Sequence, residues 1–144
     1  MLKYEKRNWK GRRPLRKIYN IEKYVDIHNK VTFIVNEKDQ DIQIIPTGRL
    51  FADSDQFAFL YIVEENDEFS YLRFGEDTWP SLVEMLQRGE DPLLSLGQRT
   101  MDLRGFHEEL ESLLYNIEGN INYGEEFVAR VEAAFQAILA NDEV

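Results

Sequence analysis

The chain has 144 residues, of which 17 are Lys or Arg and 27 are Asp or Glu, so its formal net charge at pH 7 is −10. Its 43% of hydrophobic residues excludes an intrinsically disordered acidic chain, and its length favours one globular domain. The absence of cysteine excludes disulfides, thiolate zinc sites, iron–sulfur clusters and cysteine nucleophiles.

The N-terminal segment is strongly basic. Residues 1–17 contain eight basic residues and one acidic residue, a charge of +7, which leaves −17 for the rest. The segment has no apolar signal-peptide core, and no apolar run is long enough to span a membrane, so we expect a cytoplasmic protein. We expect residues 1–16 to be a flexible basic extension and residues 17–144 to be a single domain. Binding of nucleic acid through residues 1–14 is an alternative that the acidic body opposes.

The sequence pattern after this extension predicts a series of β-strands. Hydrophobic residues alternate with a period of two from Tyr19 to Ile27, which places Val25 on the same face as Tyr19, and residues 28–30 form a turn. The β-branched and aromatic residues 31–35 predict a second strand. Further strands are expected at residues 42–45, 57–63 and 69–74, with turns at residues 36–41, 46–48 and 64–68. Of these strands, 57–63 is the most apolar, which is typical of a central strand covered on both faces.

Helical periodicity begins after Gly75. A first apolar stripe starts at Trp79 and stops at Gly89. Two more amphipathic helices are expected at residues 106–117 and 127–138, and one short strand or extended segment at residues 95–103. This order predicts an α+β fold, with an antiparallel sheet of about five strands in the N-terminal half and three helices in the C-terminal half packed on one face.

A possible metal site is centred on the second predicted helix. His107 and Glu111 are four residues apart, so they would present an imidazole and a carboxylate on one side of the helix. Further oxygen ligands would have to come from Asp53, Asp55 or Glu108. The same residues also fit a histidine beside solvated carboxylates and a turn at 53–55. No common catalytic signature is present, so we expect no metal, no other cofactor and no catalytic residue.

The loop between the last two predicted helices is a candidate for partner contact. It contains Asn122 and Tyr123, which combine an amide with an aromatic ring on a rigid scaffold. Trp79 is a further candidate. The same loop residues equally fit the cap that ends one helix and the cap that starts the next.

Four blocks of sequence resemble those of a known family. They are ADSDQFAFLY at 52–61, EDTW at 76–79, FHEEL at 106–110 and GNINYGEEFV at 119–128. In this order and spacing the chain resembles an uncharacterised family of small acidic cytoplasmic proteins of bacilli and staphylococci, from about Lys17 to Phe135. The resemblance implies no activity, cofactor or catalytic residue, and residues 1–14 depart from the family pattern.

These observations assign no biochemical activity. They favour a non-enzymatic protein-interaction or regulatory module whose partner is another protein or, in a homodimer, a second copy of the chain. The alternative is a metal-assisted hydrolase or nucleotide-processing enzyme that would use His107 with nearby carboxylates.

Overall fold

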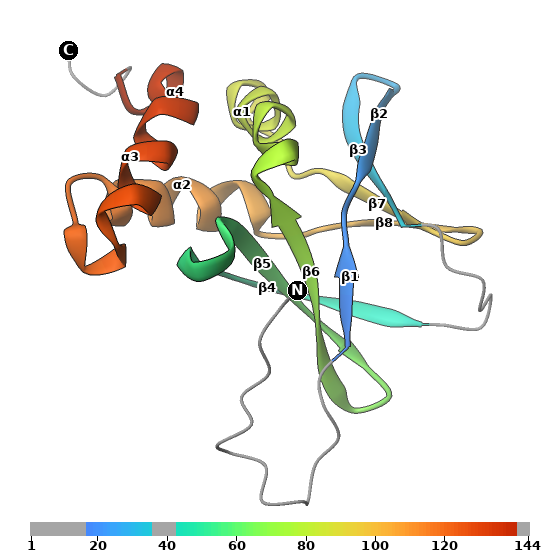
Figure 1. Ribbon diagram of the computed structural model, residues 1–144. Helices are drawn as coiled ribbons and strands as arrows, with labels where there is room; N and C mark the ends of the chain where they lie inside the picture. Colours follow the sequence, from blue (N-terminus) through green and yellow to red (C-terminus); the bar gives the residue numbers. More distant parts are fainter. Residues whose placement is uncertain (1–16, 36–42, 141–144) are drawn as a thin grey trace, which may run out of the picture.

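The computed structural model describes residues 17–35 and 43–140 (Figure 1). The predicted basic extension at 1–16 and the predicted turn at 36–41 lie outside the described residues. None of the helices in the described part is both long and apolar enough to cross a membrane.

The strands form two sheets, not one. Sheet A has the order β1 (Ile18–Asn20), β6 (Glu68–Gly75), β5 (Ala58–Glu65) and β4 (Ile44–Asp53). Sheet B has the order β2 (Lys23–Ile27), β3 (Lys30–Val35), β7 (Leu93–Leu96) and β8 (Arg99–Asp102). Both sheets are mixed, because β1 runs parallel to β6 and β3 runs parallel to β7. The α+β class is confirmed, but the prediction of one antiparallel sheet is wrong.

The first predicted strand is divided between the two sheets. Its first part, β1, pairs with β6, and its second part, β2, pairs with β3. Tyr19 is buried against the core, whereas Val25 and Ile27 are exposed. Lys23, the first residue of β2, interrupts the period-two pattern at the break, and Val25 and Ile27 then resume it in the other sheet.

Strand β4 continues through the segment that was expected to end it. Its pairing with β5 shifts between Pro46 and Arg49, which is a β-bulge. Because β4 is at the edge of sheet A, a proline there removes no hydrogen bond from the sheet interior. Gly48 adopts a φ of 80° within the bulge, a conformation that glycine adopts without strain.

The predicted hairpin turns at 28–30 and 64–68 are confirmed. His28 and Asn29 have φ values of 51° and 65°, and Asn66 and Asp67 have φ values of 54° and 64°. Two successive left-handed residues are characteristic of the type I′ turn, whose twist matches that of the flanking strands.

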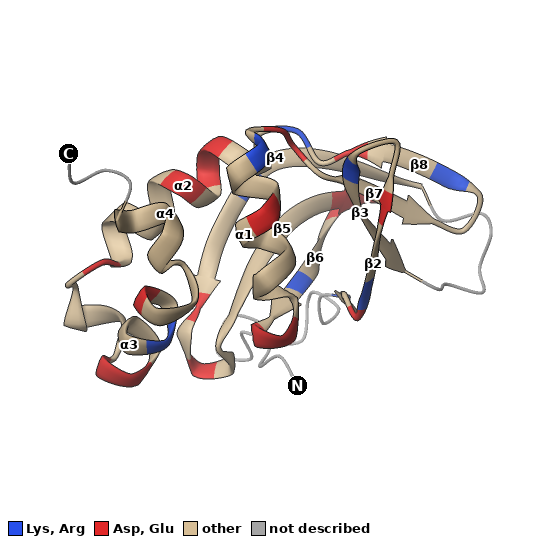
Figure 2. Cartoon of the chain, turned by 90° about the horizontal axis from the view of Figure 1, so that it is seen from above, with Lys and Arg blue, Asp and Glu red and all other residues tan. Residues whose placement is uncertain are grey.

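The described residues contain four α-helices, whereas three were predicted. They are α1 (Trp79–Arg88), α2 (Phe106–Ile117), α3 (Glu125–Ala134) and α4 (Gln136–Ala140). The last predicted helix is interrupted at the buried Phe135, whose φ of −108° leaves the helical range. The predicted single strand at 95–103 is the hairpin β7–β8, which turns at Gly97 with a φ of 61°. Figure 2 shows the helices gathered on one side of the strands, with acidic residues spread over α1, α2 and α3.

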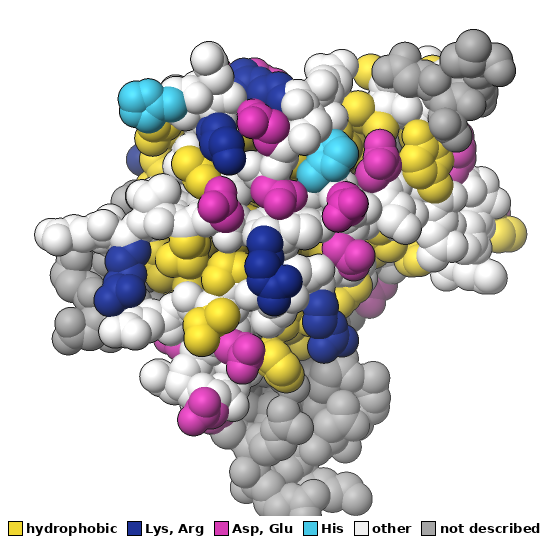
Figure 3. All heavy atoms as spheres, turned by 180° about the vertical axis from the view of Figure 1, so that it is seen from behind, with side chains coloured by type: hydrophobic (Ala, Val, Ile, Leu, Met, Phe, Trp, Pro, Cys, Tyr) yellow, Lys and Arg dark blue, Asp and Glu magenta, His cyan; other side chains and the backbone are white. Residues whose placement is uncertain are grey.

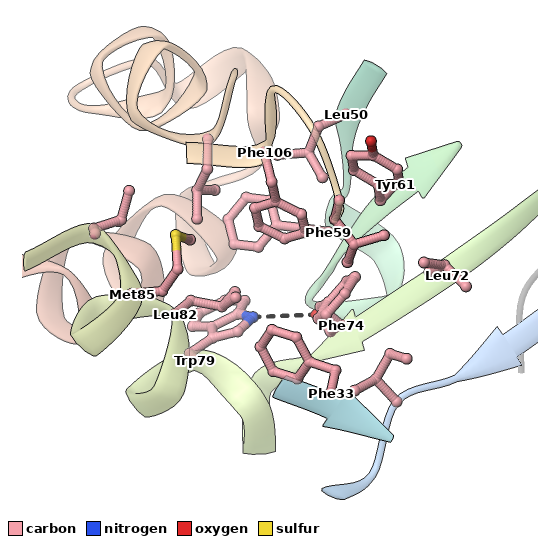
Figure 4. Packing of buried hydrophobic residues seen from close by; sticks show 14 of the residues in the cluster. Phe33, Leu50, Phe59, Tyr61, Leu72, Phe74, Trp79, Leu82, Met85 and Phe106 are labelled. Carbon is pink, nitrogen blue, oxygen red and sulfur yellow. Dashed lines mark hydrogen bonds between the residues drawn. The ribbon is translucent and has the colours of Figure 1, made fainter. Parts of the chain in front are cut away.

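The core lies between the helices and the inner faces of both sheets (Figure 4). Phe33 of β3 meets Phe74 of β6 edge to face at 4.9 Å, and Phe74 meets Phe106 of α2 at 5.0 Å. Trp79 donates its indole N–H to the Phe74 carbonyl at 3.3 Å. These contacts join sheet A, sheet B and two helices into one apolar cluster.

Candidate functional site

His107 joins two helices. Its Nε2 lies 3.3 Å from the Leu86 carbonyl oxygen in the last turn of α1, and its backbone N–H donates to Asp91 Oδ1 at 2.9 Å. The other oxygen of Asp91 accepts the N–H of Gly105 at 3.1 Å, so Asp91 caps the N-terminus of α2 from a distant segment. The imidazole thus stabilises the packing of α1 and α2.

The four candidate metal ligands lie on two separate segments of the described chain. Asp53 ends β4 and Asp55 lies in the 3₁₀ turn η2 (Ser54–Gln56), whereas His107 and Glu111 lie on α2. Within residues 17–35 and 43–140, no three His, Cys, Asp or Glu side chains are arranged to hold a metal ion. Nothing in this part of the chain supports the metal-assisted enzyme.

The loop before α3 bonds mainly to itself and to α2. Asn120 accepts the N–H of Asn122 through its side chain at 3.2 Å, and the Tyr123 hydroxyl accepts the side-chain amide of Asn116 at 2.8 Å. Asn122 is exposed and Tyr123 is half-buried. Trp79 is only 1% exposed and belongs to the core, so its indole has almost no surface to offer a partner. Contact of a partner with Asn122 or Tyr123 stays a prediction.

Strand β2 is exposed along its whole length. All five of its residues are exposed, and three of them are large hydrophobic residues: Tyr24 at 44%, Val25 at 39% and Ile27 at 42%. The strand is at the edge of sheet B, and in Figure 1 the hairpin of β2 and β3 stands out beside α1. A hydrophobic edge strand is a surface on which another polypeptide can pair.

An ion-pair network anchors the hairpin to α1. Arg88, the last residue of α1, donates to both carboxylate oxygens of Asp26, at 3.0 and 2.7 Å, and to the carbonyl of Asn29 at 2.8 Å. It also pairs with Glu84 one turn earlier. The hydrogen bonds from Arg88 lower the pKa of Asp26, and the same contacts raise the pKa of Arg88. The hairpin is therefore held in one orientation although its surface is open.

The backbone of β2 alternates between its partner strand and the open edge. Ile27 and Lys30 flank the two-residue turn, so they form a hydrogen-bonded pair. Residues 23, 25 and 27 therefore bond to β3, and the N–H and C=O groups of Tyr24 and Asp26 point to the open edge. No other strand of the described residues pairs there.

The other edge strands of the two sheets are protected. β1 has only three residues, β4 contains Pro46 and a bulge, and three of the four residues of β8 are polar. Short length, proline, bulges and charge are the devices by which proteins prevent pairing at sheet edges. β2 contains neither proline nor a bulge, and of its two charged residues, Lys23 and Asp26, the second is paired with Arg88. No signal in the sequence points to this site, because the alternation places Val25 on the same face as Tyr19, which is buried.

The face seen in Figure 3 contains no patch of a single kind. Hydrophobic, basic and acidic side chains are interspersed there, and the two histidines lie apart. This arrangement differs from the uniform cationic surface of a typical nucleic-acid-binding domain.

Comparisons place the chain among proteins without an assigned function. It matches the family described as "Family of unknown function (UPF0738)" over residues 19–135. A UPF0738 protein of Lysinibacillus sphaericus is 45% identical over 126 residues, which cover 88% of this chain and 99% of the relative. The UPF0738 protein YjbL of Bacillus subtilis is 44% identical over 90 residues, 62% of this chain and 74% of the relative. A UPF0738 protein of Staphylococcus epidermidis is 39% identical over 89 residues, which cover 62% of this chain and 73% of the relative. No solved structure gives a significant match.

Proposed function

The chain belongs to the UPF0738 family of unknown function, and we propose that it is a protein-interaction module that presents β2 as a docking edge. One observation carries the proposal: β2 is an edge strand whose five residues are all exposed and which contains Tyr24, Val25 and Ile27. Exposed hydrophobic edge strands are rare because other chains can pair with them, so the presence of one in this protein indicates a partner.

The partner that fits this edge is an extended segment of a polypeptide. Tyr24 and Asp26 offer backbone N–H and C=O groups to an added strand, and these bonds would supply affinity that is independent of the partner's sequence. Val25 and Ile27 lie on the outer face of sheet B, where alternate apolar residues of the partner would meet them. Specificity would come from these side chains.

The anchoring of the hairpin favours binding. Arg88 holds Asp26 and Asn29, so the edge is already extended before a partner arrives. A preorganised strand loses less conformational entropy on binding than a flexible one does.

We assign the docking edge to a single cytoplasmic domain of residues 17–144, with residues 1–16 as a basic extension. In support, the hydrophobic cluster draws side chains from both sheets and from all four helices. The absence of cysteine agrees with a reducing compartment.

Site-specific photocrosslinking in the producing cell tests this function. A photoreactive amino acid is placed at Val25, and in a control chain at Ile121, which is 67% exposed but lies in the loop before α3. We expect polypeptide adducts from position 25 whose crosslinked peptide maps to one segment of the partner, and background levels from position 121. Equal yields from the two positions would contradict the proposal.

A further inference from the structure

Resting on the proposed function, we infer that the segment that pairs with β2 is β2 of a second copy of this chain. The two copies would be related by a two-fold axis, the symmetry of most homodimers. Their β2 strands would then run antiparallel to each other. The two copies of sheet B, each with four strands, would then form one continuous sheet.

The backbone restricts where the axis can pass. Within β2 only Tyr24 and Asp26 point their N–H and C=O groups to the open edge, so these residues must lie in hydrogen-bonded pairs of the new ladder, which allows an axis at Tyr24, Val25 or Asp26. An axis at Val25 sets Tyr24 of each copy opposite Asp26 of the other, and each such pair exchanges two N–H···O bonds. Val25 then faces its own copy in the non-hydrogen-bonded pair between them.

Charge selects one of these positions for the axis. With the axis at Val25, Lys23 faces Ile27, and no like charges are opposed. An axis at Tyr24 would place Glu22 opposite Asp26, and an axis at Asp26 would place that carboxylate opposite its own copy. Like charges directly opposite each other destabilise a strand pair. The register centred on Val25 is therefore the one that satisfies both backbone and charge.

Side chains complement each other on both faces of this pairing. On the outer face, the two Val25 side chains meet between the two Ile27 side chains, which forms one aliphatic stripe across the junction. On the inner face, Tyr24 lies beside Asp26 of the second copy, whose own carboxylate is held by its Arg88. Val25 and Ile27, which a monomer exposes, would each gain a cross-strand neighbour from the second copy.

Disulfide trapping tests the register, and the cysteine-free chain makes each introduced thiol unique. In the full-length Val25→Cys variant the two Cα atoms would be about 4.5 Å apart, as in a non-hydrogen-bonded pair. This separation lies within the range of about 4.4 to 6.8 Å that a disulfide spans. We expect rapid formation of a covalent dimer on oxidation by diamide, which accepts the two hydrogens of the thiols.

A matched control uses Ile27, which is exposed to a similar degree as Val25. In the Ile27→Cys variant the two introduced thiols would be about 14 Å apart along the antiparallel strands, too far for a disulfide. Ile27→Cys alone should form little dimer, whereas a mixture of Lys23→Cys and Ile27→Cys chains should crosslink, because these positions face each other. Equal rates for Val25→Cys and Ile27→Cys would overturn the inference.

Charge substitution provides a second, noncovalent test by light scattering. The wild-type chain should reach twice its monomer mass of 17.0 kDa as concentration rises. Val25→Lys and Val25→Glu should each remain monomeric, and an equimolar mixture of the two should regain the dimer. A mass of 17.0 kDa for the wild type at every concentration overturns the homodimer. If position 25 then still crosslinks to another protein in the cell, the proposed function stands with a different partner. If it crosslinks to none, both fail.

Discussion

Replacing Tyr61 with Phe removes one hydroxyl that two separate backbone segments share. The fully buried Tyr61 hydroxyl donates to the Arg104 carbonyl at 2.7 Å and accepts the Gly48 N–H at 3.0 Å. It thereby links the bulge of β4 to the start of α2. The ring stacks on Phe106 with a centroid distance of 5.4 Å, and the substitution preserves this contact.

The expected cost of Tyr61→Phe is the loss of two hydrogen bonds. Each contributes about 0.5 to 1.5 kcal/mol, so the free energy of unfolding should fall by about 2 kcal/mol. Urea unfolding followed by circular dichroism measures this as a lower midpoint with an unchanged slope. Tyr24→Phe is the matched control, because Tyr24 is 44% exposed and the same deletion there should change stability by less than about 0.5 kcal/mol.

The pH dependence of stability gives an independent check on Tyr61. Burial raises the pKa of Tyr61 to about 12 from its ordinary value of 10.0. Because the folded-state pKa is the higher one, the stability linked to this proton is fully present below pH 10 and is lost as pH rises toward 12. Tyr61→Phe should lack this part of the alkaline loss. Equal destabilisation by Tyr61→Phe and Tyr24→Phe, or superimposable alkaline profiles of wild type and Tyr61→Phe, would refute the reasoning.

Three further substitutions test how the elements are joined. Asp91→Ala removes the cap of α2 and should lower the free energy of unfolding by about 0.5 to 2 kcal/mol, measured by urea unfolding, whereas an unchanged midpoint would argue against the cap. Gly105→Ala should lower the free energy of unfolding by at least about 1 kcal/mol in the same assay. Gly105 has a φ of 76°, and a Cβ there would lie 3.3 Å from the Gly48 Cα. A neutral effect would mean that the backbones at Gly105 and Gly48 can move apart. Arg88 lowers the pKa of Asp26 from 3.8, so the stability from this pair is present above pH 3.8 and is lost as pH falls through the lowered pKa. In acid unfolding, Asp26→Asn should lack this loss, and a profile identical to wild type would show that the pair contributes nothing.

Features that depend on a few neighbouring residues could be predicted from the sequence. The turn at His28 and Asn29 and the end of α1 at Gly89, which has a φ of 70°, follow from local backbone preferences. The apolar stripe of α2 repeats at helical spacing, and its buried residues are those of the stripe. Such elements form because their own residues favour them.

Strand pairing could not be predicted, because it joins segments that are distant in the sequence. Ile18 pairs with Tyr71 and Thr32 pairs with Leu93, both in parallel ladders. Nothing within a short strand specifies which distant strand it will join, since any strand presents the same backbone groups. The role of His107 is hidden for the same reason. Its spacing to Glu111 is visible in the sequence, but the groups it contacts belong to Leu86 and Asp91.

The candidate site lies in a strand whose surroundings the sequence could not show. Val25 and Ile27 share the alternation that begins at Tyr19, so the pattern places all three on one face, but Tyr19 is buried and the other two are exposed. Alternation shows that one face of a strand is apolar, but it cannot show what covers that face. In sheet B nothing among the described residues pairs with the open edge of β2. If a second copy pairs there, Val25 and Ile27 gain their cross-strand neighbours from another molecule, and such neighbours cannot be read from one chain. The Val25→Cys and Ile27→Cys pair therefore tests whether the open edge of β2 is completed by assembly.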